Sequence, residues 1–396
     1  MKEIKLIIKN KLVKKYYQGY PLILKDAIIN MKDLQEEGQL LRLVDEKQQF
    51  VAKGYYGRQN KGYGWILTHS EREEIDEAFF YQKLKRAIGK REKFFASEHT
   101  TAFRILNGEG DGVGGLTIDY FDGYYLINWY SKGMYAFKQN ILKALNSIVN
   151  YKGIYEKKRF DDNGKVVDED GFVCGERAPA PLIVKENDVN FAIYLNEGAM
   201  VGVFLDQREV RKALRDRYSS KKTVLNTFSY TGAFSIFAAL GGAVKTTSVD
   251  LANRSLAKTI EHFSINKLDY EAHDIIVEDV FHYFKYASKK KLKFDVVILD
   301  PPSFATSKKH RFSAAKDYKD LIKAAIEITE KEGMILASTN CSTFSMKQFK
   351  EFIHKAFFES GKKYQILEEY TLPEDFAVKN SFPEGNYLKV VFLRVK

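Results

Sequence analysis

The sequence predicts an α/β protein whose C-terminal half forms a doubly wound sheet, preceded by a small β-barrel and a central α+β domain. The main observation is the alternation from about residue 222, where five apolar strands each precede an amphipathic helix. A second observation is that residues 1–70 form short strand-like segments broken by glycines, a pattern typical of a small β-barrel. We therefore expect three domains, over residues 1–70, 71–187 and 188–396.

The first two expected domains contain short strands and two helical segments. Strands are predicted in the barrel at 5–9, 21–25, 39–45, 49–57 and 62–68. A helix is predicted over 70–95, with Ser70 as its N-cap and acidic residues in its first turn. In the rest of the central domain we expect strands within 116–130 and 180–186, a helix over 135–149 and a polar hairpin or loop over 160–171.

The C-terminal domain follows a regular order of strand and helix. Strands are expected at 223–228, 245–250, 273–279, 294–300 and 333–339, with helices at 231–242, 251–266, 280–290, 313–329 and 346–360. Two closing strands are expected at 364–372 and 387–395. In such a sheet the ligand site lies at the carboxyl ends of the parallel strands, so the residues there are the candidates for function.

Composition and charge narrow the class of protein. The formal net charge is +11, and residues 1–70 hold 13 Lys and Arg against 7 Asp and Glu. Residues 191–396 supply most of the remaining positive charge, which favours a polyanionic partner, nucleic acid first. With two cysteines, no signal peptide and no long apolar run, we expect a cytoplasmic protein without a membrane span. The histidines lack metal-ligand spacing, so no metal site is expected.

Ionisable side chains stand at successive strand ends of the predicted sheet. The first strand runs into "NTFSYTGAFS", and Asp250 follows Gly232 by 18 residues, close to the spacing of an acid that binds ribose hydroxyls. The pyrophosphate loop with three glycines is missing, so a nucleoside without pyrophosphate is expected, and S-adenosylmethionine fits. Asp250 is assigned to the ribose and Asp279 to the adenine amino group. The loop assigned to the amino-acid end contains Asn226, Phe228, Ser229, Tyr230, Thr231 and Gly232.

Each of these acids has a structural alternative, because an acid after a strand is often the N-cap of the next helix. In "LDPPSF", Pro301 and Pro302 stiffen the turn after Asp300, or they form with Phe304 a wall on which a flipped base stacks. Lys308 and Lys309 either bind phosphate or belong to a solvated basic loop. The block of Asp206, Gln207 and Arg208 either closes over the amino-acid end of the cofactor or forms an ion-pair cluster.

The motifs "NTFSYTGAFS", "SVD", "VED", "VILDPPSF" and "STNCST" occur in the order found in class I methyltransferases. Together they resemble the bacterial ribosomal RNA (cytosine-C5)-methyltransferase family. Residues 103–121, 202–211 and the closing "FPEGNYLKV" resemble further signatures of that family, and residues 1–70 resemble its PUA domain. The resemblance covers essentially the whole chain. It implies a PUA-like RNA-binding barrel, a central α+β domain and a C-terminal Rossmann-like domain that uses S-adenosylmethionine to methylate large-subunit ribosomal RNA.

Cys341 decides between the reactions that this resemblance allows. Cytosine C5 is a poor nucleophile, and attack of a thiolate on C6 makes it enamine-like, so a cysteine is needed as a covalent catalyst. Cys341 follows the fifth strand and precedes a helix N-terminus, which suits an ionised thiol, whereas Cys174 is expected to be structural. Asp300 is expected to hydrogen-bond the base. The alternative is that Cys341 is a buried filler residue.

Two rival functions follow if Cys341 is a filler. A related group of ribosomal RNA enzymes methylates guanine and lacks the cysteine after the fifth strand. The other rival is a non-catalytic RNA-binding factor in ribosome assembly that keeps an unused cofactor fold. The joint presence of Asp250, Asp279, Asp300 and Cys341 favours an enzyme. The sequence leaves open whether the chain forms a homodimer.

Overall fold

The computed structural model describes residues 3–58, 62–160, 170–198, 200–306 and 311–396. The chain forms two compact units. Unit 1 comprises residues 1–184, 194–201 and 374–385, and unit 2 comprises residues 185–193, 202–373 and 386–396. The three-domain division remains a prediction. Among the described residues, no helix is long and apolar enough to cross a membrane.

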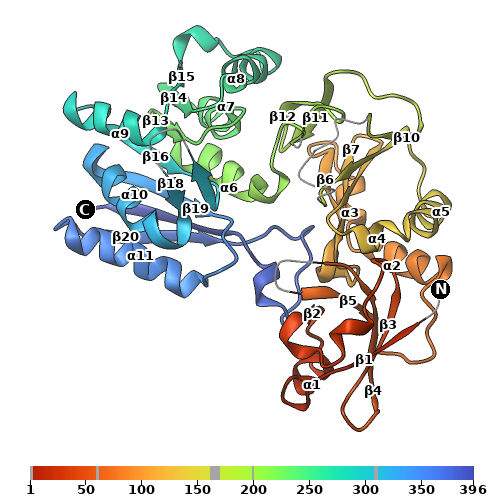
Figure 1. The fold of residues 1–396 in the computed structure, drawn as a ribbon. Helices are drawn as coiled ribbons and strands as arrows, with labels where there is room; N and C mark the ends of the chain where they lie inside the picture. The colour runs from red at the N-terminus through yellow and green to blue at the C-terminus, as the bar shows by residue number, and fades with distance from the viewer. Residues whose placement is uncertain (1–2, 59–61, 161–169, 199, 307–310) are drawn as a thin grey trace. The chain divides into compact units, whose positions relative to one another are not determined.

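The N-terminal part of unit 1 is a five-stranded sheet with the order β1-β3-β4-β5-β2 (Figure 1). Its strands are β1 (Ile4–Ile7), β2 (Leu22–Leu24), β3 (Leu40–Val44), β4 (Phe50–Tyr56) and β5 (Gly62–Thr68). An antiparallel bridge between Ile8 and Ile28 joins the segments that follow the two edge strands. All five strands were predicted. The helix α1 (Asn10–Tyr17), which buries Val13 and Tyr16, was not predicted.

A second five-stranded sheet, of order β10-β9-β8-β7-β6, makes up the rest of unit 1. It contains β6 (Ala102–Asn107), β7 (Leu116–Phe121), β8 (Tyr124–Trp129), β9 (Gly153–Lys158) and β10 (Phe172–Gly175), and its helices are α2 (Glu77–Gly89), α3 (Glu92–Phe95), α4 (Lys132–Tyr135) and α5 (Lys138–Ile148). The prediction that Ser70 is the N-cap of α2 was wrong. The helix begins later because the Asp76 carboxylate accepts a hydrogen bond from Phe79 N at 2.9 Å. Most of the predicted loop over 160–171 lies outside the described residues.

One hydrophobic core joins the two sheets of unit 1. It runs from Leu6 in β1 to Ile154 in β9 and contains Trp65 and Trp129. The Tyr55 hydroxyl of β4 donates a hydrogen bond to the Gly114 carbonyl at 2.7 Å, in a buried position. Because this core is continuous across residue 70, removal of residues 1–70 would expose apolar side chains of the remaining unit.

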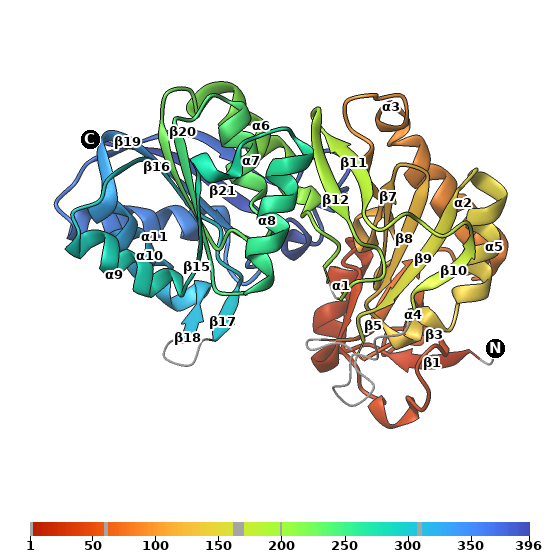
Figure 2. The same ribbon diagram turned by 90° about the horizontal axis from the view of Figure 1, so that it is seen from above.

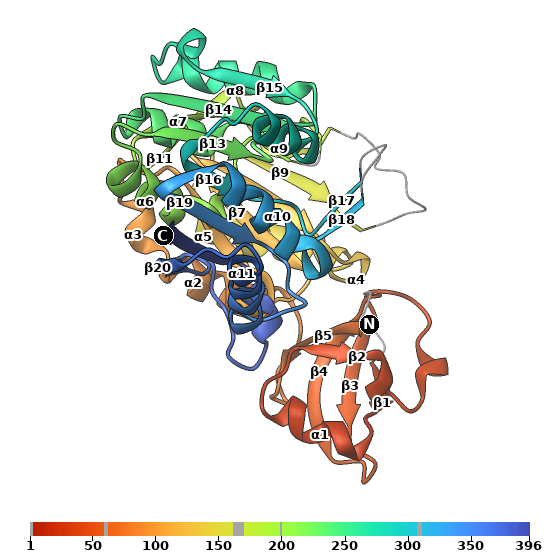
Figure 3. The same ribbon diagram turned by 90° about the vertical axis from the view of Figure 1, so that its left-hand side faces the viewer.

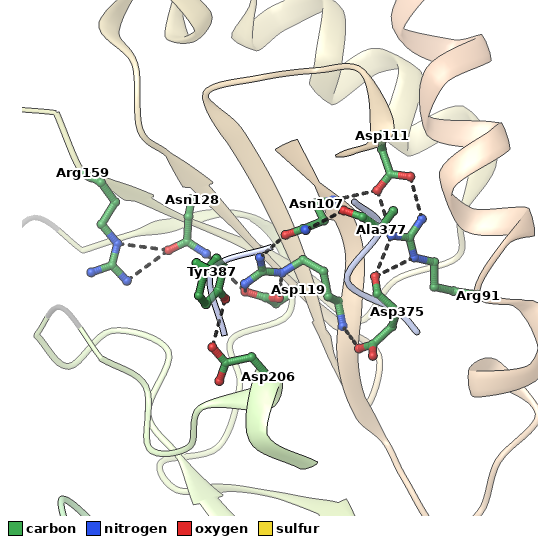
Figure 4. Close-up of polar contacts among 11 residues, drawn as sticks. Arg91, Asn107, Asp111, Asp119, Asn128, Arg159, Asp206, Asp375, Ala377 and Tyr387 are labelled. Carbon is green, nitrogen blue, oxygen red and sulfur yellow. Dashed lines mark hydrogen bonds and ion pairs between the residues drawn. The ribbon is translucent and has the colours of Figure 1, made fainter. Parts of the chain in front are cut away.

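The C-terminal segment 374–385 belongs to unit 1 and is bound there by buried polar contacts (Figure 4). Arg91 is 1% exposed, pairs with Asp111 at 2.8 Å and donates to the Asp375 carbonyl. Asn107 Nδ2 donates to the Ala377 carbonyl at 2.8 Å. The chain thus leaves unit 2 after Pro373 and returns to it at Asn386.

Unit 2 contains a seven-stranded sheet with the order β15-β14-β13-β16-β19-β21-β20. Its strands are β13 (Thr223–Thr227), β14 (Lys245–Asp250), β15 (Asp274–Val277), β16 (Phe294–Leu299), β19 (Thr329–Thr339), β20 (Tyr364–Tyr370) and β21 (Lys389–Val395). The first five are parallel, and β21 is antiparallel to both of its neighbours. This confirms the predicted doubly wound sheet with two closing strands.

Helices cover both faces of this sheet, as Figure 2 shows. One face packs against α9 (Val280–Lys289), α10 (Ala314–Ile328) and α11 (Met346–Glu359), and the other against α6 (Arg208–Ala213) and α7 (Ala233–Leu240). Successive residues of a strand alternate between the two cores: Val297 lies in the first core, and Val296 and Ile298 lie in the second. This double burial explains the nearly continuous apolar strands of the sequence.

Two further strand pairs and one more α-helix complete the α-helices and strands of the described residues. The strands β11 (Leu182–Glu186) and β12 (Val189–Ile193) pair with each other, and α8 (Arg254–Ile265) follows β14. A second hairpin, β17 (Phe304–Thr306) and β18 (Arg311–Ser313), lies directly before α10 (Figure 3). Because β13 is flanked by β14 and β16, the direction of winding changes there, which places the expected ligand site after these strands.

A candidate active site at the strand ends of unit 2

The loop between β13 and α7 has a strained backbone. Phe228 and Tyr230 have positive φ angles of 54° and 52°, and Gly232 has a φ of 76°. A Cβ atom at Gly232 would lie 2.5 Å from Thr259 Cγ2, so this position requires glycine. Non-glycine residues in this conformation cost roughly 1–3 kcal/mol each and cluster at ligand sites. The loop therefore has the geometry of a site that a ligand approaches closely.

Polar side chains of this loop are buried. Asn226 Nδ2 donates to Ser235 Oγ at 3.0 Å, whereas Asn226 Oδ1 is buried and has no hydrogen-bond partner among the described residues. Thr231 Oγ1 donates to the Gly202 carbonyl at 2.7 Å, and the Ser229 backbone N–H donates to a carbonyl of β14 at 3.1 Å. A buried acceptor without a donor suits a bound polar ligand. These residues therefore fit the nucleoside cofactor that the sequence predicts.

Asp250, the last residue of β14, fixes the same loop. Its Oδ2 accepts a hydrogen bond from Tyr230 N at 2.8 Å, and its Oδ1 accepts one from Ala252 N at 2.9 Å. Each carboxylate oxygen has a further lone pair. The structure thus brings Asp250 and the predicted loop together and leaves acceptor capacity for ribose hydroxyls. That ribose role remains a prediction.

Asp279 has the geometry of a helix N-cap. Its Oδ1 accepts hydrogen bonds from Phe281 N at 2.9 Å and from His282 N at 3.2 Å, and α9 begins at Val280. This is the structural alternative considered for the strand-end acids. The cap uses one carboxylate oxygen, and the predicted contact to adenine remains untested.

Asp300 follows β16 and is hydrogen-bonded to Gln207. Gln207 Nε2 donates to Asp300 Oδ1 at 2.7 Å and to Ser338 Oγ of β19 at 3.1 Å. Burial raises the pKa of Asp300 to about 6, and the nearby Asp206 carboxylate also raises it. A carboxyl group with this pKa is partly protonated near neutral pH and can donate as well as accept a hydrogen bond. Gln207 thus contacts this carboxyl in the structure, and its expected place at the cofactor remains a prediction.

Cys341 lies in the turn between β19 and α11. Its side chain is 2% exposed, and its Sγ lies 3.1 Å from Thr343 Oγ1. Its backbone N–H donates to Thr339 Oγ1 at 3.2 Å, which fixes the turn. Ser345 caps α11 through a capping box four residues further on. The thiol therefore stands in a defined turn before a helix, as the sequence predicted.

The block of Asp206, Gln207 and Arg208 forms internal polar contacts in unit 2. The Tyr387 hydroxyl donates to Asp206 Oδ2 at 2.9 Å, a contact also drawn in Figure 4. Arg208 is 2% exposed, and its Nε lies 3.2 Å from Glu209 Oε1. These contacts match the ion-pair alternative for the block, and its role at the cofactor remains a prediction.

The predicted base-binding wall is partly accessible. Pro301 is buried, Pro302 is exposed, and Phe304 in β17 is 70% exposed. An aromatic ring with this exposure is available for stacking, although its role is untested. Lys308 and Lys309 lie outside the described residues.

Comparison with known proteins decides the family. A model of the S-adenosylmethionine-dependent methyltransferase family matches residues 165–368, and a PUA-like domain model matches residues 6–69. The chain belongs to the S-adenosylmethionine-dependent methyltransferase family. S-adenosylmethionine is therefore the cofactor of this methyltransferase, and the predicted PUA-like domain is confirmed.

Relatives of the methyltransferase match it over nearly their whole lengths. YwbD of Bacillus subtilis, whose name gives a provisional assignment as a ribosomal RNA large subunit methyltransferase, is 61% identical over 99% of each chain. Ribosomal RNA large subunit methyltransferase I of Escherichia coli is 29% identical over 99% of each chain. The crystal structure of SMU.776 complexed with SAH, a provisionally assigned methyltransferase, superposes with a TM-score of 0.91 at 39% identity, covering 99% of this chain and 100% of the other.

Sequence reasoning missed one buried residue of the methyltransferase beside Cys341. Lys389, the first residue of β21, is 4% exposed and donates from Nζ to the Cys341 carbonyl at 3.0 Å. It lies within the closing motif "FPEGNYLKV", but the sequence does not reveal that β21 pairs with β19. Among the described residues of the methyltransferase, no group of three or more His, Cys, Asp or Glu side chains is arranged to hold a metal ion.

Proposed function

We propose that this methyltransferase acts on large-subunit ribosomal RNA and methylates C5 of a cytosine through a covalent bond to Cys341. The names of the two relatives described above support the RNA substrate. The observation that carries the choice of base is the position of Cys341 after β19, whose neighbour β16 is followed by Asp300. A thiol and a carboxyl group on neighbouring strand ends are the two groups that cytosine C5 chemistry requires.

In the proposed reaction the Cys341 thiolate attacks C6 of the cytosine. An S–C6 bond forms, the C5–C6 double bond opens, and electron density moves to C5 and the N3 side of the ring. Asp300 in its protonated form donates a hydrogen bond to that side of the ring and stabilises the charge that develops there. S-adenosylmethionine, when bound, supplies the electrophilic methyl group that C5 takes up. A base then removes the C5 proton, the double bond re-forms, and the thiolate leaves.

The residues around the β13–α7 loop would hold the cofactor. Asp250 has acceptor capacity for two ribose hydroxyls, and Asn226 Oδ1 offers a buried acceptor for a donor of the amino-acid end. Gly232 keeps the loop in its positive-φ conformation close against Thr259. Gln207 would position the Asp300 carboxyl group through its hydrogen bond.

Nucleoside analysis tests this proposal. Large-subunit ribosomal RNA from a strain that lacks the enzyme is incubated with purified protein and isotopically labelled S-adenosylmethionine, then digested and analysed by mass spectrometry. We expect label in 5-methylcytidine with wild-type protein and none with Cys341→Ala. Label in a methylated guanosine would contradict the cytosine assignment. Binding of RNA and cofactor without transfer would favour the non-catalytic RNA-binding factor.

A cytoplasmic location is proposed together with this function, because the proposed substrate is ribosomal RNA. A homodimer remains a prediction that no observation on the chain tests.

A further inference from the structure

Lys389 is a buried cation in unit 2 whose polar contacts are neutral. Its Nζ donates to the Cys341 carbonyl at 3.0 Å and to the Tyr387 carbonyl at 2.8 Å, and it lies 5.5 Å from the ring centroid of Phe344. An ammonium group has three N–H donors, so one remains beyond these two hydrogen bonds. Carbonyls and an aromatic ring stabilise a cation but do not neutralise it.

Buried cations elsewhere in unit 2 have carboxylate partners. Arg211 binds Glu186 through two contacts of 2.7 Å, and both side chains are almost fully buried. Arg208 lies beside Glu209. A buried charge without a counterion is costly, so the surroundings of Lys389 favour an anion close to it.

The hydrogen bond from Lys389 Nζ to the Cys341 carbonyl places the ammonium group beside the cysteine, which makes its thiol the candidate anion. Burial lowers the pKa of Lys389, and the charge of Cys341 acts in the opposite direction. The other ionisable groups near β19 interact elsewhere: Tyr318 of α10 and Asp206 both interact with Asp300, which follows β16. The first turn of α11 carries no acidic residue. The Tyr387 hydroxyl, two residues from Lys389, binds Asp206, so the thiol of the residue whose carbonyl Lys389 binds is the candidate partner.

Lys389 also fixes the position of the thiol. The side chain joins β21 to the turn after β19 by binding the carbonyl of the cysteine itself. The register pairs Lys389 with Thr339, whose Oγ1 accepts the hydrogen bond from Cys341 N. The backbone of the cysteine is therefore held from both sides, at its N–H and at its carbonyl.

We propose that Lys389 is a positioning residue that holds Cys341 as a thiolate and fixes its turn for attack on the base. The proposal rests on the function proposed above for the cysteine. Ionisation breaks the S–H bond, the proton passes to water, and Lys389 stays protonated as the counterion. The thiolate and the ammonium group then form a buried ion pair, which makes the nucleophile available without a separate base for the thiol.

The first test is a direct titration of the thiol without RNA. Full-length protein in the Cys174→Ser background, labelled with [13Cβ]cysteine, reports the ionisation of Cys341 through its carbon chemical shift. We expect Lys389→Met to raise the midpoint by at least about one pH unit, which is a tenfold fall in the acid dissociation constant of the thiol. Lys389→Arg keeps the charge and should keep the midpoint within a few tenths of a unit. An unchanged midpoint in Lys389→Met would overturn the ion pair.

A second variant separates charge from packing. Lys389→Gln keeps amide donors for the two carbonyls and removes the charge. If Lys389→Met does not fold, the titration midpoint of Cys341 in Lys389→Gln tests the ion pair. Both variants should bind S-adenosylmethionine with wild-type affinity, and the methylation kcat should fall tenfold or more. If the midpoint rises while methylated guanosine is the product, the ion pair stands and the proposed reaction fails. If Lys389→Gln keeps both the wild-type midpoint and kcat, Lys389 has only a structural role.

Discussion

At the residue scale, burial makes ionisation of the Asp300 carboxyl group unfavourable in the folded protein. Burial raises its pKa to about 6, while hydrogen bonds from Ser338 and Gln207 act against this rise. Because the folded-state pKa is above that of an unfolded chain, the contribution of Asp300 to stability is complete below about pH 4. It is lost as the pH rises through about 6. At neutral pH the ionised carboxylate therefore opposes folding, which is acceptable at a site that needs a proton donor.

Asp300→Asn should accordingly stabilise the protein at neutral pH. The amide keeps an oxygen acceptor for Gln207, and the ionisation cost disappears. We expect the free energy of unfolding to rise by about 1–2 kcal/mol at pH 7.5, because solvent partly screens the charge, and to change little at pH 4. Thermal unfolding across this pH range measures the difference.

Asp295 is a control in β16, the strand that Asp300 follows, because its pKa is shifted in the opposite direction. Hydrogen bonds from Thr223 and contact with Lys222 lower the pKa of Asp295 in spite of burial. Its stabilising contribution is present at neutral pH and lost as the solution becomes acidic, so Asp295→Asn should destabilise the protein at pH 7.5. If both variants lose stability at pH 7.5, ionisation of Asp300 does not destabilise the folded protein.

At the element scale, the β13–α7 loop depends on a glycine that no larger residue can replace. Gly232 combines a φ of 76° with contact to the buried Thr259. Gly232→Ala should lower the free energy of unfolding by about 1–3 kcal/mol and weaken S-adenosylmethionine binding, because the loop must shift. Chemical denaturation and calorimetry measure the two effects.

Gly89 is the matched control for this substitution. It ends α2, and a Cβ atom there would have no neighbour within 4 Å. Gly89→Ala should be neutral or stabilising by up to about 1 kcal/mol and should leave cofactor binding unchanged. Equal effects of the two substitutions would show that the loop tolerates a side chain.

Periodicity explains which elements were predictable. The seven strands of the large sheet in unit 2 and the helices between them were predicted from sequence. The central strands β13, β16, β19 and β21 contribute apolar side chains to both cores, and the helices are apolar on one face. The start of α2 was wrong because several acids and Ser70 precede it, and only the structure shows that Asp76 makes the cap. Lys389 and Cys341 are 48 positions apart in sequence, and only the pairing of β21 with β19 brings them into contact.

At the scale of the whole molecule, the sequence does not reveal how the chain divides. Residues 374–385 interrupt unit 2 and belong to unit 1, where Arg91 and Asn107 bind their backbone. Such a return follows from tertiary contacts and leaves no periodic signal. The positive charge of residues 1–70, by contrast, is visible in composition alone and leads directly to an expectation about RNA.

Two exposed lysines of α1 offer a test of RNA binding that preserves the shared core of unit 1. Lys11 and Lys14 are exposed, and the buried side chains of this helix are Val13 and Tyr16. If the PUA-like domain contacts phosphate, Lys11→Glu with Lys14→Glu should weaken RNA binding and reduce the slope of log affinity against log salt by about 1.5.

A double substitution with the same change of charge is the control. Lys319 and Lys323 of α10 both lie within 3 Å of Glu359 and are already paired. Lys319→Glu with Lys323→Glu should change the salt slope less. Equal slopes for the wild type and the α1 variant would exclude this helix from the RNA interface.

Trapping of a covalent adduct tests most directly whether Cys341 attacks the base. RNA with 5-fluorocytosine at the target position cannot release its C5 substituent, so attack by Cys341 should leave a denaturant-resistant complex with the wild-type protein. Cys174→Ala, which removes the other cysteine, should form the same adduct, and Cys341→Ala should form none while still binding S-adenosylmethionine. If the wild type forms no adduct and Cys341→Ala still methylates the RNA, Cys341 is not the nucleophile.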